Sequence, residues 1–290
     1  MGGLGNQLFQ YAAGRAMALR NDAELKLDVL SGFAYDDIYH RAYCLKHFNI
    51  VERFASPFES YMKTMGRFRR VVARRASRYF PRAEYLYVRE RSDVFDSRIT
   101  GLVAQRVVYV DGLWQNTGYF RDIENELRKE LQIKTPHDEL NMRIAGEISG
   151  SNAVSIHIRR LFRLPGSSTP QPVEDSDNIP GLCGRSYYQK AINRIADSVS
   201  NPHFYVFSDY PEWARKNLEG SFPMTFITHN GEEKYYEDFW LVSKCKHHII
   251  ANSTFSWWAA WLSAYPEKRV IAPAICKAFS DEDLPGWDYI

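Results

Sequence analysis

The second half of this 290-residue chain alternates between short apolar runs and stretches with helical spacing, and this alternation constrains the fold more than any other feature. Runs of strand length and helical stretches follow one another with short polar connections. Such alternation predicts a mostly parallel, doubly wound α/β sheet with helices on both faces. The expected strands are 152–159, 204–208, 224–228, 248–251 and 269–272, and the expected helices are 187–198, 212–218, 235–245 and 255–264.

Polar residues follow three of the expected strands. Arg159-Arg160, Ser208-Asp209 and Asn252-Ser253-Thr254 each stand where a strand leads into a loop. Ligands of doubly wound sheets bind at the carboxyl ends of the strands. We therefore expect these three strand ends to open on one edge of the sheet and to form a binding site.

The third of these strand ends leads directly into an aromatic helix. A helix that begins after Asn252-Ser253-Thr254 presents free backbone N–H groups and the positive end of its dipole. Such a helix start binds anions, most often phosphate. The alternative is an ordinary N-cap, with Trp258, Trp261 and Leu262 facing the core.

The first of these strand ends carries His157-Ile158-Arg159-Arg160. Alternation along the strand places His157 and Arg159 on one face, and Arg160 reaches into the loop. A guanidinium at this edge suits a diphosphate, which it can hold by bidentate, charge-assisted hydrogen bonds. The alternative is a pair of structural arginines that form ion pairs.

The first half of the chain is less regular. It predicts a helix over 8–21, strands over 24–28 and 107–110, and two helices within 119–148 that are separated at Thr135-Pro136. We expect an N-terminal domain over 1–135 and a C-terminal domain over 150–290. The glycine-rich start and Asp28 also keep a nicotinamide-dependent oxidoreductase open, although Leu8 stands where the dinucleotide fingerprint has its third glycine.

Composition and charge exclude several classes of protein. The net charge of +2 argues against a dedicated nucleic-acid binder, and no apolar run approaches the roughly 20 residues that span a bilayer. Four scattered cysteines without a C-x-x-C pair fit reduced thiols, so we expect a soluble, cytoplasmic protein. The basic, helically spaced stretch 65–91 predicts either a solvated helix face or a surface that rests on the anionic inner face of the membrane.

Separate blocks of this sequence resemble the motifs of one family, the bacterial α-1,2-fucosyltransferases of glycosyltransferase family eleven. The combination is far more specific than any block alone, and it spreads over nearly the whole chain. The blocks are Gly2 through Ala12, His157 through Arg160, Phe207-Ser208-Asp209 with Pro211-Glu212-Trp213, and Ile250 through Leu262, with further matches at Asp111-Gly112-x-Trp114-Gln115 and Tyr236-Glu237-Asp238.

The resemblance implies a GT-B-like fold of two Rossmann-like domains that face a cleft, the first domain lacking its first strand here. It implies GDP-β-L-fucose as the donor, no metal ion or other cofactor, and an inverting transfer to a sugar hydroxyl, usually the 2-OH of a terminal β-galactoside. A non-catalytic protein that binds a GDP-sugar is the alternative from another class. Asp175-Ser176-Asp177 resembles a metal-binding Asp-x-Asp, but its Pro/Ser-rich setting favours a solvated loop.

The resemblance also implies roles for individual residues. Arg160 and His157 would be the catalytic residues: Arg160 would hold the β-phosphate, and His157 would face the guanosine together with Asp209. The remaining donor-binding positions are Arg159, Asn252, Ser253, Thr254 and Ser256 in the C-terminal domain and Gly3, Asn6 and Gln7 at the cleft. The family usually continues Arg-Arg-Gly-Asp-Tyr, whereas Phe162 stands at the place of that acid here, so Glu174, Asp175 and Asp177 are the candidates to activate the acceptor.

Overall fold

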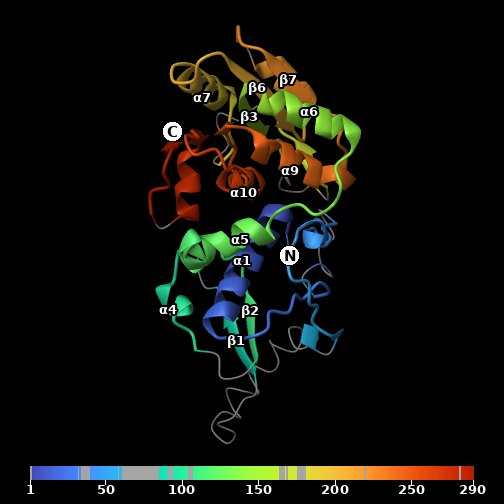
Figure 1. Cartoon of the computed structure of the whole chain (residues 1–290), viewed down its shortest axis with the longest axis vertical. Helices are drawn as coiled ribbons and strands as arrows, with labels where there is room; N and C mark the ends of the chain where they lie inside the picture. The colour runs from blue at the N-terminus through green and yellow to red at the C-terminus, as the bar shows by residue number, and fades with distance from the viewer. Residues whose placement is uncertain are drawn as a thin grey trace, which may run out of the picture. The chain divides into compact units, whose positions relative to one another are not determined.

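A computed structural model describes most of the chain (Figure 1). The described residues are 2–31, 33, 40–57, 59–60, 85–90, 94–103, 107–162, 167, 169–174, 181–218, 220–280 and 282–290. The chain divides into two compact units, Met1–Gln132 (unit 1) and Ile133–Ile290 (unit 2).

Unit 2 is built on a six-stranded sheet in which every neighbouring pair of strands is parallel. The strands are β3 (Asn152–Ile158), β6 (Pro202–Ser208), β7 (Met224–Ile227), β8 (His247–Ile249), β9 (Val270–Ala272) and β10 (Trp287–Tyr289), in the spatial order β10-β9-β8-β3-β6-β7. The prediction of an α/β, doubly wound sheet in this half of the chain is confirmed. Strand β10 was not expected from the sequence.

Helices alternate with these strands and cover both faces of the sheet. They are α6 (Glu139–Ser149), α7 (Arg185–Ala196), α8 (Pro211–Asn217), α9 (Tyr235–Lys244) and α10 (Thr254–Leu262). Each of the four helices predicted in this half is present, with ends that shift by at most two residues. Helix ends fray and depend on caps, so a shift of this size is ordinary.

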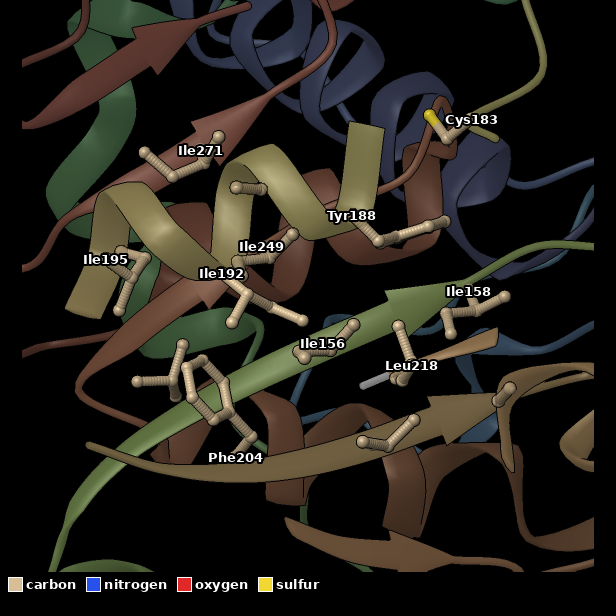
Figure 2. Close-up of a cluster of buried hydrophobic side chains, with 14 of the residues drawn as sticks. Ile156, Ile158, Cys183, Tyr188, Ile192, Ile195, Phe204, Leu218, Ile249 and Ile271 are labelled. Carbon is tan, nitrogen blue, oxygen red and sulfur yellow. The ribbon is translucent and has the colours of Figure 1, made fainter. Parts of the chain in front are cut away.

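The core on one face of the sheet lies beneath α7 and α8 (Figure 2). Ile156 on the central strand is fully buried there, and Tyr188, Ile192 and Ile195 of α7 pack over it. On the other face, Phe255 of α10 stacks on His157 and meets Phe239 of α9. Because both faces are covered, the strands are apolar almost throughout rather than alternating.

Unit 1 contains a long helix, α1 (Leu4–Arg20), and a parallel pair of strands, β1 (Tyr85–Arg89) and β2 (Val107–Asp111). It also contains the short helix α4 (Ser97–Thr100) and the helix α5 (Glu124–Glu130). Helix α1 begins at Leu4, earlier than the predicted start at Leu8, so residues 4–7 form its first turn. The second Rossmann-like domain stays a prediction.

The prediction of a strand over 24–28, a segment that the structure describes in full, is wrong. Leu27 forms one isolated bridge with Phe54, and the extended segment then ends. The Asp28 carboxylate accepts hydrogen bonds from the backbone N–H groups of Leu30 and Ser31, at 3.0 and 2.9 Å. Aspartate side chains that bond the backbone two or three residues on favour a turn over a strand.

Most of the basic stretch 65–91 lies outside the described residues. Its described end forms strand β1 (Tyr85–Arg89), so the predicted helix does not extend to residue 91. No helix among the residues that the structure describes is long and apolar enough to cross a membrane.

Candidate functional site

The carboxyl ends of β3, β6 and β8 lie side by side in unit 2. Ile158 pairs with Ser208 across β3 and β6, and Ile156 pairs with Ile249 across β3 and β8. The chain runs from β3 outward through β6 and β7, and then returns to the other side of β3 with β8. The sheet therefore has its topological switch point between β3 and β8, which is where open α/β sheets bind ligands.

Asp209, just after β6, fixes the turn that follows β3. Its carboxylate accepts hydrogen bonds from the backbone N–H groups of Arg160 (2.6 Å) and Leu161 (3.2 Å). It also accepts a bond from the Arg159 guanidinium at 2.7 Å. Asp209 thus orders the His157–Arg160 block through the backbone and binds the partly exposed arginine beside it.

Arg160 has a different environment from its neighbour. Its side chain is fully buried, and the guanidinium carbon lies 3.3 Å from the centroid of the Trp213 ring on α8. A cation over the face of an indole is attracted by the negative face of the ring, more strongly when water is excluded. The two adjacent arginines are therefore positioned in separate ways, one by an ion pair and one by an aromatic ring.

His157 lies under α10 at the same edge. Its ring stacks on Phe255 with centroids 5.3 Å apart, and its buried Nδ1 atom has no hydrogen-bond partner in the described structure. Burial lowers the pKa of His157 to about 3, and the nearby Arg159 charge adds to this shift. The imidazole is therefore neutral at physiological pH.

The buried, neutral histidines of unit 2 predict that the folded protein becomes less stable in acid. Burial also lowers the pKa of His247 to about 4, so both rings resist protonation in the folded protein. Their contribution to stability is present above the unfolded pKa of about 6.5 and is lost as the pH falls toward 4. We expect the melting temperature to fall between pH 6.5 and 5, and to fall less in His157→Phe, as circular dichroism would show. An equally steep fall in that variant would contradict the role of His157.

The start of α10 is the third part of this edge. Ser253 occupies the N-cap position with extended backbone, but its side chain accepts no hydrogen bond from the first helical turn, which contains no acidic residue. Ser256 is fully buried and its hydroxyl donates to the Ser253 carbonyl at 3.2 Å, whereas Thr254 is half-buried as the first residue of the helix. Asn252 donates to the Gly181 carbonyl at 2.9 Å. The dipole of this nine-residue helix favours an anion at the edge.

A short segment, Gln171–Glu174, runs beside the turn after β3, and we call it the strap. Its strand β5 (Gln171–Pro172) pairs antiparallel with β4 (Leu161–Phe162). Glu174, a candidate to activate the acceptor, accepts a hydrogen bond on Oε1 from the Tyr210 hydroxyl at 2.6 Å. The other two candidates, Asp175 and Asp177, lie outside the described residues.

The predicted residues of unit 1 lie at the start of α1. Gly2 adopts a φ of +80°, and a Cβ atom there would lie 2.6 Å from the Asn6 amide nitrogen, so this position requires glycine. Asn6 accepts a hydrogen bond from Gln115 at 2.8 Å, and a Cβ atom added to Gly3 would meet the Arg41 guanidinium at 3.8 Å. A ligand role for Gly3, Asn6 and Gln7 stays a prediction.

Gln7 is nearly completely buried and joins two segments of unit 1. Its amide nitrogen donates to the Gly2 and Ala42 carbonyls at 2.8 and 2.9 Å, and its amide oxygen accepts from the Cys44 N–H at 2.8 Å. All of these partners are backbone groups. In the described structure Gln7 thus holds residues 42–44 against the helix start.

Gln7→Ala should lower the free energy of unfolding of unit 1 by about 2–3 kcal/mol, because three backbone groups lose their partner in a buried place. Urea unfolding followed by fluorescence measures this loss. Gln132→Ala is the matched control, since the Gln132 side chain is exposed and its amide donates to the Arg128 carbonyl of the preceding helical turn, and it should cost less than about 0.5 kcal/mol. Equal losses in the two variants would contradict the structural role of Gln7.

Asp28, the residue that left an oxidoreductase as an alternative function, has its carboxylate hydrogen-bonded within unit 1. Besides the two backbone N–H groups, the hydroxyls of Ser31 and Tyr109 donate to its carboxylate. Burial raises the pKa of Asp28, but hydrogen bonds from Ser31, Tyr109 and Leu30 outweigh burial and lower it to about 2. This carboxylate is engaged in fixing a turn and does not stand ready for a ribose.

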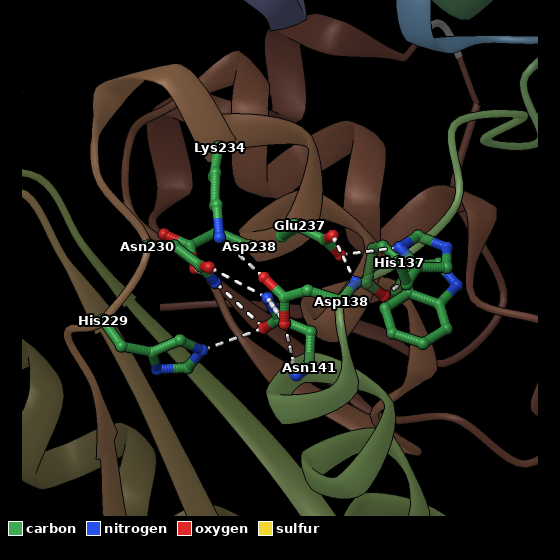
Figure 3. A network of polar contacts seen from close by, with 10 residues as sticks. His137, Asp138, Asn141, His229, Asn230, Lys234, Glu237 and Asp238 are labelled. Carbon is green, nitrogen blue, oxygen red and sulfur yellow. Dashed lines mark hydrogen bonds and ion pairs between the residues drawn. The ribbon is translucent and has the colours of Figure 1, made fainter.

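A polar network joins the start of α6 to α9 and the loop before it (Figure 3). The Glu237 carboxylate, almost completely buried, binds the His137 ring at 2.6 Å and accepts from the Asp138 N–H at 3.3 Å. The His137 ring stacks on Trp240 with centroids 3.5 Å apart. Because residues 133–138 open unit 2, Glu237 anchors the first segment of the unit to α9.

The second half of the network surrounds Asn141, which is fully buried. Asn141 exchanges hydrogen bonds with Asn230 at 2.9 and 3.1 Å, and Asn230 in turn donates to Asp238 at 2.8 Å. Burial raises the pKa of Asp238 to about 7; the bond from Asn230 opposes this shift and the charge of Glu237 supports it. Glu237 and Asp238 belong to the Tyr236-Glu237-Asp238 motif, but the sequence indicated no role for either residue.

Trp213 is the residue of the site whose role the sequence did not show. It belongs to the Pro211-Glu212-Trp213 block, yet nothing in the pattern indicated that the Arg160 guanidinium would lie over its ring. Among the described residues, no group of three or more His, Cys, Asp or Glu side chains is arranged to hold a metal ion.

The sequence of this chain is similar to those of known glycosyltransferases. The model of a family described as Glycosyl transferase family 11 matches residues 78–290. The chain is 36% identical to an alpha-1,2-colitosyltransferase of Escherichia coli, over 99% of this chain and 93% of that protein, and 29% identical to the Escherichia coli O-antigen biosynthesis glycosyltransferase WbnK, over 94% and 91%. It is 27% identical to galactoside alpha-(1,2)-fucosyltransferase 1 of Bos taurus, over 50% of this chain and 41% of that protein. This chain belongs to glycosyl transferase family 11.

Proposed function

We propose that this chain is an inverting glycosyltransferase that moves a deoxy-L-galactose, either L-fucose or colitose, from a GDP donor to the 2-OH of a galactoside. The observation that carries the proposal is the 36% identity to an alpha-1,2-colitosyltransferase along nearly the whole of both chains. The name of the bovine relative supports fucose and a galactoside acceptor. Colitose is L-fucose without its 3-OH, so the two donors differ by one hydroxyl.

The chemistry of the reaction fits the carboxyl edge of the unit 2 sheet. As the bond from the sugar to the diphosphate breaks, negative charge builds up on the leaving GDP. Fixed donors aimed at that charge lower the barrier, and one such donor contributes about 10²–10³-fold. Arg160 and the start of α10 are the two groups that we assign to this task, since both stand at this edge.

The attacking hydroxyl must lose its proton during transfer. Glu174, Asp175 and Asp177 remain our candidates to accept it, and Glu174 is held by the Tyr210 hydroxyl. Arg160 has no exposed surface in this structure, so donor binding must uncover its guanidinium. The strap, which is bonded to the Arg160 carbonyl through the Val173 N–H at 3.0 Å, is one described neighbour of that residue.

The proposal is tested by supplying GDP-L-fucose and GDP-colitose in parallel with a panel of β-galactosides, measuring GDP release and determining the linkage of the product. We expect acceptor-dependent GDP release and an α-1,2-linked product with one of the two donors. Tight GDP binding without turnover for any pair would instead indicate a non-catalytic GDP-sugar binder. Absence of both binding and turnover would overturn the proposal.

A further inference from the structure

Trp213 contacts both Arg160, in the turn after β3, and the strap that runs beside this turn. The face of its ring lies under the Arg160 guanidinium, 3.3 Å from the centroid to the guanidinium carbon. Its indole N–H donates to the backbone carbonyl of Glu174, in the strap, at 2.8 Å. The residue itself is almost completely buried in the first turn of α8, which begins with Pro211. One rigid side chain therefore touches the buried arginine and the strap.

Among the aromatic side chains, tryptophan is suited to both contacts. A phenylalanine offers a ring face for a cation but no donor, and a tyrosine places its hydroxyl at the far end of the ring. The indole has the strongest cation-binding face of the three and an N–H at the ring edge. The strap is fastened independently by Tyr210, which donates to the Glu174 side chain, so the ring and the N–H of Trp213 have separable roles.

We propose that Trp213 is a positioning residue for donor binding, which acts by holding the Arg160 guanidinium in place through its ring face. This inference rests on the proposed function, because the guanidinium is assigned to the diphosphate there. Asp209 fixes the backbone of Arg160, and Trp213 fixes its side chain, so the two residues together determine where the charge stands. The N–H bond to the strap has the secondary role of keeping Glu174 beside Tyr210.

The test is a double-mutant cycle with GDP as the probe, measured by calorimetry on folded protein. Trp213→Leu removes the ring face and should weaken GDP binding about 30-fold, the size of a desolvated cation–π contact. Once Arg160→Met has removed the charge, Trp213→Leu should have little further effect on GDP affinity, since the ring acts through the arginine. Trp213→Phe keeps a ring face and should bind GDP within about 3-fold of the wild type. In turnover, Trp213→Leu should raise the KM for the donor as well as lower kcat.

Trp287→Leu is the matched control, because Trp287 lies on β10, the edge strand at the opposite end of the sheet, and packs against Trp257 and Tyr289. It should lower the melting temperature without changing GDP affinity. Additive losses in the cycle, or a loss in Trp213→Phe as large as that of Arg160→Met, would overturn the inference. If the leucine variant does not fold, the phenylalanine variant decides by the same criterion. Wild-type protein that binds no GDP would instead refute the proposed function.

Discussion

Arg160→Met is expected to lower the rate of sugar transfer by about 10²–10³-fold while leaving the melting temperature unchanged or slightly raised. The loss is the contribution of one fixed donor to the leaving diphosphate. Stability should change little because keeping a charged group away from water costs free energy, and a methionine fills much of the same buried space without a charge. A methionine also makes favourable sulfur contacts with an aromatic ring such as Trp213. Steady-state kinetics and thermal unfolding measure the two effects separately.

Arg215→Met is the matched control for that substitution. Arg215 lies on the same helix as Trp213, is exposed, and stands over the Phe226 ring with its guanidinium carbon 4.5 Å from the centroid. Like Arg160, it places a guanidinium over an aromatic ring, but it does not stand at the carboxyl edge of the sheet. The rate of sugar transfer should stay within about 3-fold of the wild type, because an exposed cation–π contact contributes only about 0.5–1 kcal/mol. Similar rates for the two variants would remove the assigned role of Arg160.

Glu237→Ala is expected to be strongly destabilising, with a loss of about 3 kcal/mol in the free energy of unfolding. The carboxylate is almost completely buried, and its removal leaves the His137 ring and the Asp138 N–H without their acceptor. Removing one partner from a buried polar pair costs more than the pair itself contributes, because the remaining group is left desolvated. Urea unfolding monitored by fluorescence reports the loss through Trp240, which stacks on His137.

Glu147→Ala provides the comparison on the surface of α6. The Glu147 side chain is 53% exposed and lies 4.0 Å from Arg143, so its removal should cost less than about 0.5 kcal/mol. If Glu237→Ala were no more harmful than this variant, the network around His137 would not hold the first segment of unit 2 as described.

The fold of unit 2 could be predicted from the sequence because its signal is local and repeated. Apolar runs such as 204–208 are short, lie between turn residues and alternate with helical patterns, so each element supports the assignment of the next. The strand predicted over 24–28 had no such support. There the charged residues and the Asp28 turn outweighed a brief alternation of leucines, and a strand also needs a partner that the local sequence does not specify.

The site could be predicted only in part, for a related reason. Strand ends at one edge of a parallel sheet follow from topology, so Asp209 and Arg160 could be placed together before any contact was known. The side-chain environment could not. Nothing in the local sequence indicated that Arg160 would be buried against Trp213, 53 positions later in the chain. Nor did it indicate that the Gln7 side chain would form hydrogen bonds with the backbone of Ala42 and Cys44. Contacts between distant segments require the packed structure.

The placement of the donor site at the carboxyl edge of the unit 2 sheet is tested most directly by amide hydrogen exchange, measured by mass spectrometry with and without GDP. We expect GDP to slow exchange in peptides covering residues 157–162 and 250–257 of unit 2, at the carboxyl ends of β3 and β8. Exchange in β10 and in the network around Glu237 should not change. Protection confined to unit 1, with none at 157–162 or 250–257, would contradict a donor site at this edge of the sheet.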